Sequence, residues 1–166
     1  MFAAVDVDYR AAETSIAAAV FFQDWSDAEP VEEHTEQISE VDEYVPGEFF
    51  RRELPPLMRV LARKRHKLSL VIVDGYVWIE GTDDARGLGA HVYEALGSRI
   101  PVVGVAKTPM QRAGECISVL RGQSETPLFV SAIGMDPKLA ATHVETMHGR
   151  FRIPTLLKRV DRLTRE

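Results

Sequence analysis

The chain has 166 residues, of which 45% are hydrophobic, and its formal net charge is −5 at pH 7. This length and composition predict one globular domain over residues 1–166 and exclude an intrinsically disordered chain. No apolar run approaches the roughly 20 residues of a membrane helix, and the start lacks the basic region of a signal peptide, so we expect a cytoplasmic protein. The one cysteine, Cys116, cannot form an internal disulfide.

The negative charge is concentrated in one segment. Residues 24–43 contain nine acidic residues and no lysine or arginine, and basic residues outnumber acidic ones elsewhere. Because phosphate binding depends on lysine and arginine, the net charge argues against a protein that coats nucleic acid nonspecifically. Basic clusters at 51–52, 63–67 and 158–165 are compatible with more selective binding of nucleic acid, although such clusters are usually solvated helix faces.

The N-terminal quarter of the chain predicts three strands, at about 2–9, 14–24 and 30–39. The runs are rich in β-branched and aromatic residues, and short polar segments separate them. Consecutive strands with short connections can pair as an antiparallel meander.

A turn at 44–47 precedes a predicted helix over 48–66. Pro55 and Pro56 are expected to break this helix or shift its start, because proline lacks the backbone N–H that a helix interior requires. The helix is predicted from apolar residues at helical spacing, which are Phe50, Leu54, Leu57, Met58 and Leu61.

Helices and strands alternate in the remainder of the chain. The expected elements are strands at 68–74 and 101–106, a strand pair at 117–120 and 127–131, and helices at 88–96, 136–147 and 155–163. A strand meander followed by alternating helices and strands predicts an α/β fold. We expect a ribonuclease H-like mixed sheet, in which an antiparallel three-strand meander is followed by parallel strands and flanked by helices.

Three acidic residues lie where one site could form. Asp6 and Asp74 interrupt or end apolar strands, and Glu53 lies on the helix between them. A buried carboxylate costs several kcal/mol unless it is paired or bound to a metal, and hard cations such as Mg²⁺ prefer oxygen ligands. The alternative is that each aspartate only ends a strand or turn and that Glu53 is a solvated partner of Arg51 or Arg52.

Eight short segments carry a family resemblance. They are AVDVDY (4–9), YVPG (44–47), FRRE (50–53), VDG (73–75), LGAH (88–91), GVAK (104–107), PLFVS (127–131) and GRFRIP (149–154). In this order, over most of the chain, they resemble a divergent and short member of the endonuclease V family, whose members cut nucleic acid near deoxyinosine.

The resemblance implies a DNA-repair type hydrolase that cleaves a phosphodiester in DNA or RNA containing a deaminated purine. Asp6, Glu53 and Asp74 match the family's metal-binding carboxylates, which implies Mg²⁺ as cofactor with Mn²⁺ able to substitute. Lys107 matches the active-site lysine, whose charge would offset the charge that develops in the transition state.

The resemblance also implies a nucleic-acid contact surface. Tyr44, Val45, Pro46 and Gly47 match the segment that wedges into the strand beside the lesion, a use of apolar side chains known from other proteins that unstack bases. Arg52, in the matching segment beside Glu53, is a further candidate nucleic-acid contact. We expect no membrane partner.

Two family histidines are replaced in this chain. Glu80 stands six residues after Asp74, where the family has a histidine, and Met135 with Asp136 stands where a later histidine is expected. Glu80 or Asp136 could add a metal ligand. Neither replaces an imidazole in proton transfer, because ordinary carboxylates do not titrate near neutrality.

Two other functions remain open on the sequence. One is a catalytically silent nucleic-acid or protein-binding module on the same fold, suggested by the missing histidines and the acidic segment at 24–43. The other is a haloacid dehalogenase-type phosphatase, suggested by Asp6 and Asp8 after an apolar strand, with Lys107 present. No acidic pair follows Lys107 at a strand end, as that mechanism requires.

Overall fold

The fold is built on a seven-stranded sheet in a computed structural model that describes residues 1–10, 14–39, 49–81 and 85–166. The strand order is β3-β2-β1-β4-β5-β7-β6. The strands are β1 (Phe2–Arg10), β2 (Thr14–Phe22), β3 (Glu32–Ser39), β4 (Leu70–Asp74), β5 (Val102–Ala106), β6 (Ile117–Val119) and β7 (Leu128–Ile133).

The sheet is mixed, as the sequence predicts. Strands β1, β2 and β3 form the expected antiparallel meander, and β4 and β5 run parallel to β1. Strands β7 and β6 complete the sheet as an antiparallel pair beside β5. The prediction of an α/β fold with a ribonuclease H-like mixed sheet is therefore confirmed.

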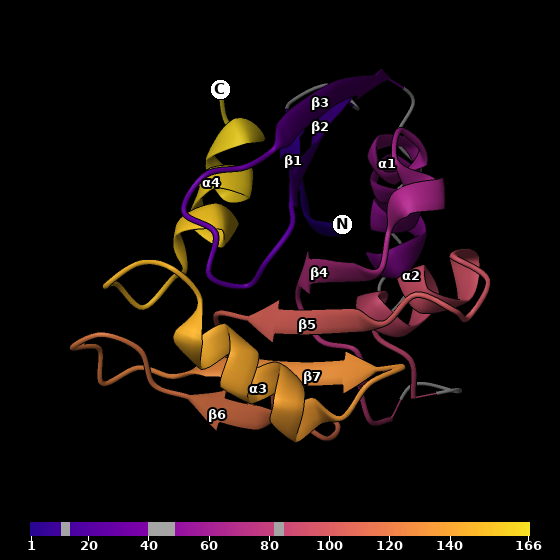
Figure 1. The fold of residues 1–166 in the computed structure, drawn as a ribbon. Coiled ribbons are helices and arrows are strands. Elements are labelled where there is room, and N and C mark those ends of the chain that lie inside the picture. The colour runs from indigo at the N-terminus through magenta and orange to yellow at the C-terminus, as the bar shows by residue number, and fades with distance from the viewer. Residues whose placement is uncertain (11–13, 40–48, 82–84) are drawn as a thin grey trace.

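Helices cover both faces of the sheet (Figure 1). Helices α1 and α2 pack on one face, where Leu57, Leu61 and Val92 join a buried apolar cluster with the strands. Helices α3 and α4 pack on the other face through residues such as Val144 and Leu156. The helices are α1 (Phe49–Ala62), α2 (Leu88–Ala95), α3 (Pro137–Thr146) and α4 (Thr155–Leu163), with a 3₁₀ turn, η1, at Arg65–Lys67.

Two prolines lie within α1 without ending it. The expectation that Pro55 and Pro56 break the helix or shift its start is wrong, because α1 includes Phe49 and runs through both prolines to Ala62. Each proline removes one intrahelical hydrogen bond. The apolar side of the helix compensates, since Pro56, Leu57, Val60 and Leu61 are all buried against the sheet.

The acidic segment pairs with basic residues of this chain. Glu32 on β3 forms ion pairs with Arg63 and Lys64, and Glu33 accepts two hydrogen bonds from the Arg159 guanidinium of α4. Hydrogen bonds from Arg63 and Lys64 lower the pKa of Glu32 to about 2. Much of the charge that β3 carries is therefore balanced within the fold.

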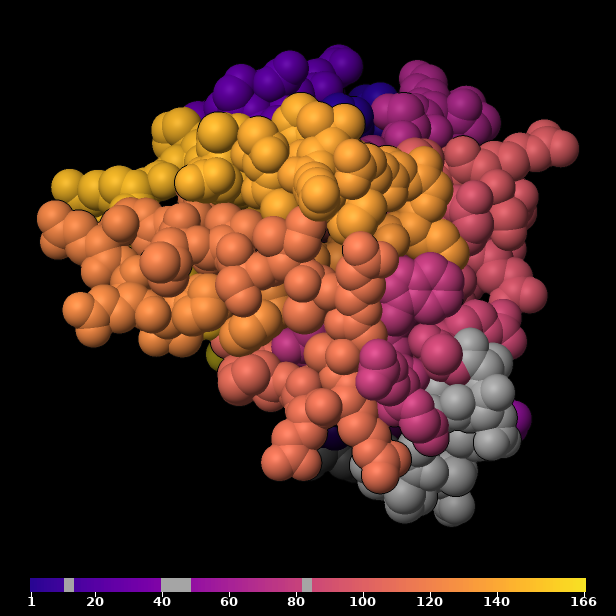
Figure 2. Space-filling model, turned by 90° about the horizontal axis from the view of Figure 1, so that it is seen from below, coloured from indigo at the N-terminus to yellow at the C-terminus, as the bar shows by residue number. Residues whose placement is uncertain are grey.

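The second half of the chain forms most of one surface. In Figure 2, seen from the β6 side, residues coloured orange cover most of the visible face and the indigo N-terminal strands lie at its rim. Among the described helices, none is long and apolar enough to cross a membrane.

Candidate active site

Three parallel strands bring polar residues to one edge of the sheet. In the β1–β4 register Val5 pairs with Val73, so Asp6, in the middle of β1, lies beside Asp74 at the carboxyl end of β4. Lys107 follows β5, the next strand along the same edge. The carboxyl ends of parallel strands are where α/β folds place their ligands.

A third aspartate completes the cluster. One carboxylate oxygen from each of Asp6, Asp74 and Asp161 can be chosen so that all three lie within 4.8 Å of one another. Asp161 comes from α4, which Leu157 and Val160 anchor against the sheet. Hard divalent cations bind such all-oxygen sets, so the donors that this fold brings together fit a Mg²⁺-type ion.

Sequence reasoning missed Asp161. A signal was present, because Asp161 is the only acidic residue between Glu145 and Glu166 and directly follows Val160 on the apolar stripe of a strongly amphipathic helix. An acidic residue at the border of a buried helix face is expected to interact with a polar group beneath that face.

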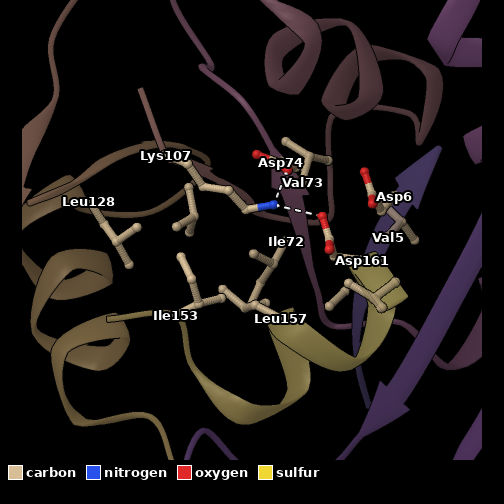
Figure 3. Close-up of a pocket in the computed structure, with 13 residues that line it drawn as sticks. Val5, Asp6, Ile72, Val73, Asp74, Lys107, Leu128, Ile153, Leu157 and Asp161 are labelled. Carbon is tan, nitrogen blue, oxygen red and sulfur yellow. Dashed lines mark hydrogen bonds and ion pairs between the residues drawn. The ribbon is translucent and has the colours of Figure 1, made fainter. Parts of the chain in front are cut away.

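Lys107 bridges two of the aspartates (Figure 3). Its Nζ lies 2.6 Å from Oδ2 of Asp74 and 3.0 Å from Oδ1 of Asp161. Burial lowers the pKa of Lys107, but the hydrogen bonds and charges of both aspartates outweigh burial, so its pKa is raised overall. The ammonium is therefore firmly protonated. The apolar side chains beneath it, including Ile72, Leu128, Ile153 and Leu157, line a small cavity of about 20 Å³.

Glu53 lies in the same groove as the aspartates but outside the close cluster. The groove has a volume of about 520 Å³, and Asp6, Glu53, Asp74, Lys107 and Asp161 all line it. Glu53 does not belong to the set whose oxygens lie within 4.8 Å of one another. The three aspartates can therefore coordinate one ion directly, whereas Glu53 lies further along the groove.

Two carboxyl groups of the site have raised pKa values. Burial, followed by the charges of Asp6 and Asp74, raises the pKa of Glu53 to about 8. Burial, followed by the charge of Asp74, raises the pKa of Asp6 to about 6, although Lys107 opposes the rise. A bound cation would reverse this effect, because positive charge favours ionised carboxylates.

The other sequence-predicted residues lie in different places. Tyr44, Val45, Pro46 and Gly47 lie outside the described residues. The guanidinium carbon of Arg52 lies 4.1 Å from the centroid of the Tyr9 ring, a cation–π contact within the protein. Glu80 is exposed in a turn where its N–H donates to the Arg112 carbonyl oxygen, and it does not line the groove. Asp136 caps α3 by accepting a hydrogen bond from the Lys138 N–H.

Three carboxylates and a lysine at the carboxyl edge of a ribonuclease H-like sheet define a candidate site for phosphoryl transfer. The family model for endonuclease V matches residues 1–119. Endonuclease V of Rhodospirillum centenum is 30% identical over 180 residues, which cover 95% of this chain and 73% of that protein. The chain therefore belongs to the endonuclease V family of nucleases, as its sequence motifs predict.

Solved structures agree with this assignment. The crystal structure of endonuclease V from Streptomyces avermitilis has a TM-score of 0.71 at 28% identity and covers 99% of this chain and 79% of its own. The structure of Ciona intestinalis endonuclease V, in complex with a 24mer DNA containing an inosine followed by a ribo-adenosine, has a TM-score of 0.79 at 19% identity. That match covers 99% of this chain and 84% of the Ciona chain.

Proposed function

We propose that this chain is a metal-dependent endonuclease that hydrolyses a phosphodiester in inosine-containing nucleic acid, with Mg²⁺ as its ion and Mn²⁺ able to replace it. The observation that carries the proposal is the cluster that Asp6, Asp74 and Lys107 of the sheet form with Asp161 of α4. Family membership favours a nuclease over the phosphatase alternative.

The three aspartates would hold the ion, and Glu53 would act from the side of the groove. A bound divalent ion polarises a phosphoryl oxygen and lowers the pKa of an attacking water. The aliphatic part of the Lys107 side chain packs against apolar residues, and its ammonium group stays protonated. Lys107 is therefore suited to stabilise the negative charge of the transition state. Glu53 would orient water in the groove that it lines.

A second cavity next to the cluster could hold a base. It has a volume of about 150 Å³ and shares Glu53 and Asp74 with the catalytic groove. Its other lining residues are mainly apolar or aromatic and include Phe49, Tyr76, Leu88 and Met110. Apolar walls with a few polar groups suit a base that has been taken out of its stack. The complex of the Ciona relative with inosine-containing DNA supports inosine as that base.

The experiment is cleavage of labelled oligonucleotides, as DNA and as RNA, that contain either one inosine or a guanosine in its place. We expect cleavage of the inosine substrate only, dependent on Mg²⁺ or Mn²⁺ and abolished by EDTA. Asp74→Asn should remove activity, while Glu145→Gln, which changes an exposed glutamate on α3, should not.

Two outcomes would contradict the proposal. Binding of the oligonucleotides without cleavage at saturating metal would favour the catalytically silent module. Metal-dependent release of phosphate from a small phosphomonoester, with intact oligonucleotides, would favour a phosphatase.

A further inference from the structure

A second, larger groove opens from the candidate active site. It has a volume of about 1010 Å³ and shares Lys107, Asp161 and Arg165 with the catalytic groove, so the two are continuous. The remaining lining comes from the segment before α4, from α4 itself, and from Gln123 and Ser124. Of the proposed catalytic residues, only Lys107 and Asp161 line this larger groove.

The larger groove is strongly basic. One acidic residue, Asp161, lines it, and that aspartate is already paired with Lys107 and Arg165. Two exposed cations remain, Arg150 and Lys158, and within the part of the chain that the structure describes neither forms an ion pair with an acidic side chain. The cations that line the groove are Lys107, Arg150, Arg152, Lys158 and Arg165.

An aromatic ring lies among the free cations. Phe151 is 59% exposed, which is unusual for a side chain of this size. The guanidinium carbon of Arg150 lies 5.0 Å from the ring centroid and the Nζ of Lys158 lies 5.7 Å from it. An exposed ring next to two cations matches what unpaired nucleic acid requires, because a base can stack on the ring while the cations contact phosphates.

A buried arginine holds this segment in place. Arg121 is only 4% exposed, and its guanidinium donates hydrogen bonds to five carbonyl oxygens. A buried cation is costly unless it is fully hydrogen-bonded, so this arrangement strongly favours one conformation of the segment. With the carbonyl groups turned inward, the segment presents Phe151 to the groove as a rigid platform. The five acceptors are the carbonyl oxygens of Glu145, Met147, Gly149, Phe151 and Arg152.

Arg152 supports the platform from its other side. Its Nε donates to the Thr126 carbonyl oxygen at 3.0 Å, and its Nη2 donates to the carbonyl oxygens of Pro127 and Lys107. The side chain thereby links the platform directly to the backbone of the candidate catalytic lysine. Arg152 is therefore a structural residue of the groove, and Arg150 and Lys158 are the cations left for a ligand.

We infer that this groove binds the unpaired strand that flanks the cleaved phosphodiester, with one base stacked on Phe151 and neighbouring phosphates bound by Arg150 and Lys158. The inference rests on the proposed function for the identity of the cleaved strand. It assigns to the platform a contact that does not depend on inosine, because stacking and phosphate contacts are nearly independent of sequence.

The test measures binding separately from cleavage. Fluorescence anisotropy in EDTA would follow a labelled single-stranded oligonucleotide with a central inosine, and a matched one with guanosine. Phe151→Ala should weaken binding of both by about 5- to 100-fold, and Phe151→Trp should retain it. Lys158→Ala should weaken both and reduce the slope of log affinity against log salt by about 0.7.

The chain offers matched controls away from the groove. Leu139 is 49% exposed and Lys138 is exposed, both on α3, so Leu139→Ala and Lys138→Ala remove similar groups elsewhere. Both variants should bind with unchanged affinity. Truncating the oligonucleotide on each side of the inosine should cost the unmodified protein affinity on one side, and Phe151→Ala should remove that dependence.

The outcomes separate this inference from the proposed function. Unchanged affinity of Phe151→Ala and Lys158→Ala overturns the inference even if inosine cleavage is normal. An equal loss in the α3 controls also overturns it, because the effect would then be general surface charge. A selective loss in the groove variants supports it even if no cleavage is found, in which case only the catalytic proposal fails.

Discussion

The Nζ of Lys107 lies 2.6 Å from Oδ2 of Asp74, one of the three aspartates that could hold a cation. The lysine therefore offsets part of the negative charge of the aspartates and, by like-charge repulsion, opposes the entry of a metal ion. Two opposite effects of Lys107→Met follow. Turnover should fall by about two to three orders of magnitude, because transition-state charge loses its partner. Affinity for Mn²⁺ should rise, by about tenfold, because a competing positive charge is removed.

These two effects can be measured independently. Calorimetric titration with Mn²⁺ reports the affinity, and single-turnover cleavage at saturating metal reports the chemistry. A variant that binds Mn²⁺ no more tightly and cleaves at the normal rate would make Lys107 a residue that only covers apolar surface.

The second prediction separates two aspartates. Asp161→Asn removes a charged oxygen from the cluster and should lower Mn²⁺ affinity by about 10-fold or more and abolish cleavage at low metal concentration. Asp136→Asn is the control, because asparagine caps a helix as well as aspartate does and Asp136 only caps α3. The reverse pattern, in which only Asp136→Asn loses Mn²⁺ affinity and cleavage, would make Asp136 the metal ligand, as the sequence-based hypothesis suggests.

The ease of predicting these residues differs for a physical reason. Asp74 ends β4, and Asp6 lies within β1 directly after the last residue that pairs with β4, so the parallel register alone places these two aspartates side by side. The position of Asp161 depends on how α4 crosses the sheet. The packing of Leu157 and Val160 sets that crossing, which is not a local property of the sequence. Element positions were predictable from periodicity, whereas the continuity of α1 through Pro55 depends on tertiary burial.

The third prediction concerns Glu80. Its side chain is exposed in a turn and does not line the catalytic groove, so we expect Glu80→His to leave the pH dependence of cleavage unchanged. The sequence-based hypothesis of an extra ligand at this position predicts instead a new group titrating near 6.5. Comparison of cleavage rates from pH 5 to pH 9 decides between the two.

The last prediction follows from the raised pKa of Glu53. This pKa moves from 4.5 to about 8 in the folded protein, so between these values the unfolded chain releases a proton that the folded chain retains. The contribution of Glu53 to stability is therefore fully present below pH 4.5 and is lost as the pH rises through about 8. Asp6, with a pKa of about 6, adds a loss of the same sign over a lower pH range.

Glu53→Gln should make the metal-free protein more stable than the unmodified chain at pH 8, by about 1–2 kcal/mol after allowance for solvent screening of a partly exposed group. Thermal unfolding in EDTA between pH 5 and pH 8.5 measures this difference, with Glu145→Gln as the exposed control. Adding Mg²⁺ should raise the unfolding temperature of the unmodified chain most at high pH, because the ion binds ionised carboxylates. Parallel pH profiles for Glu53→Gln and the unmodified chain would mean that Glu53 is ionised and solvated, and would remove it from the proposed site.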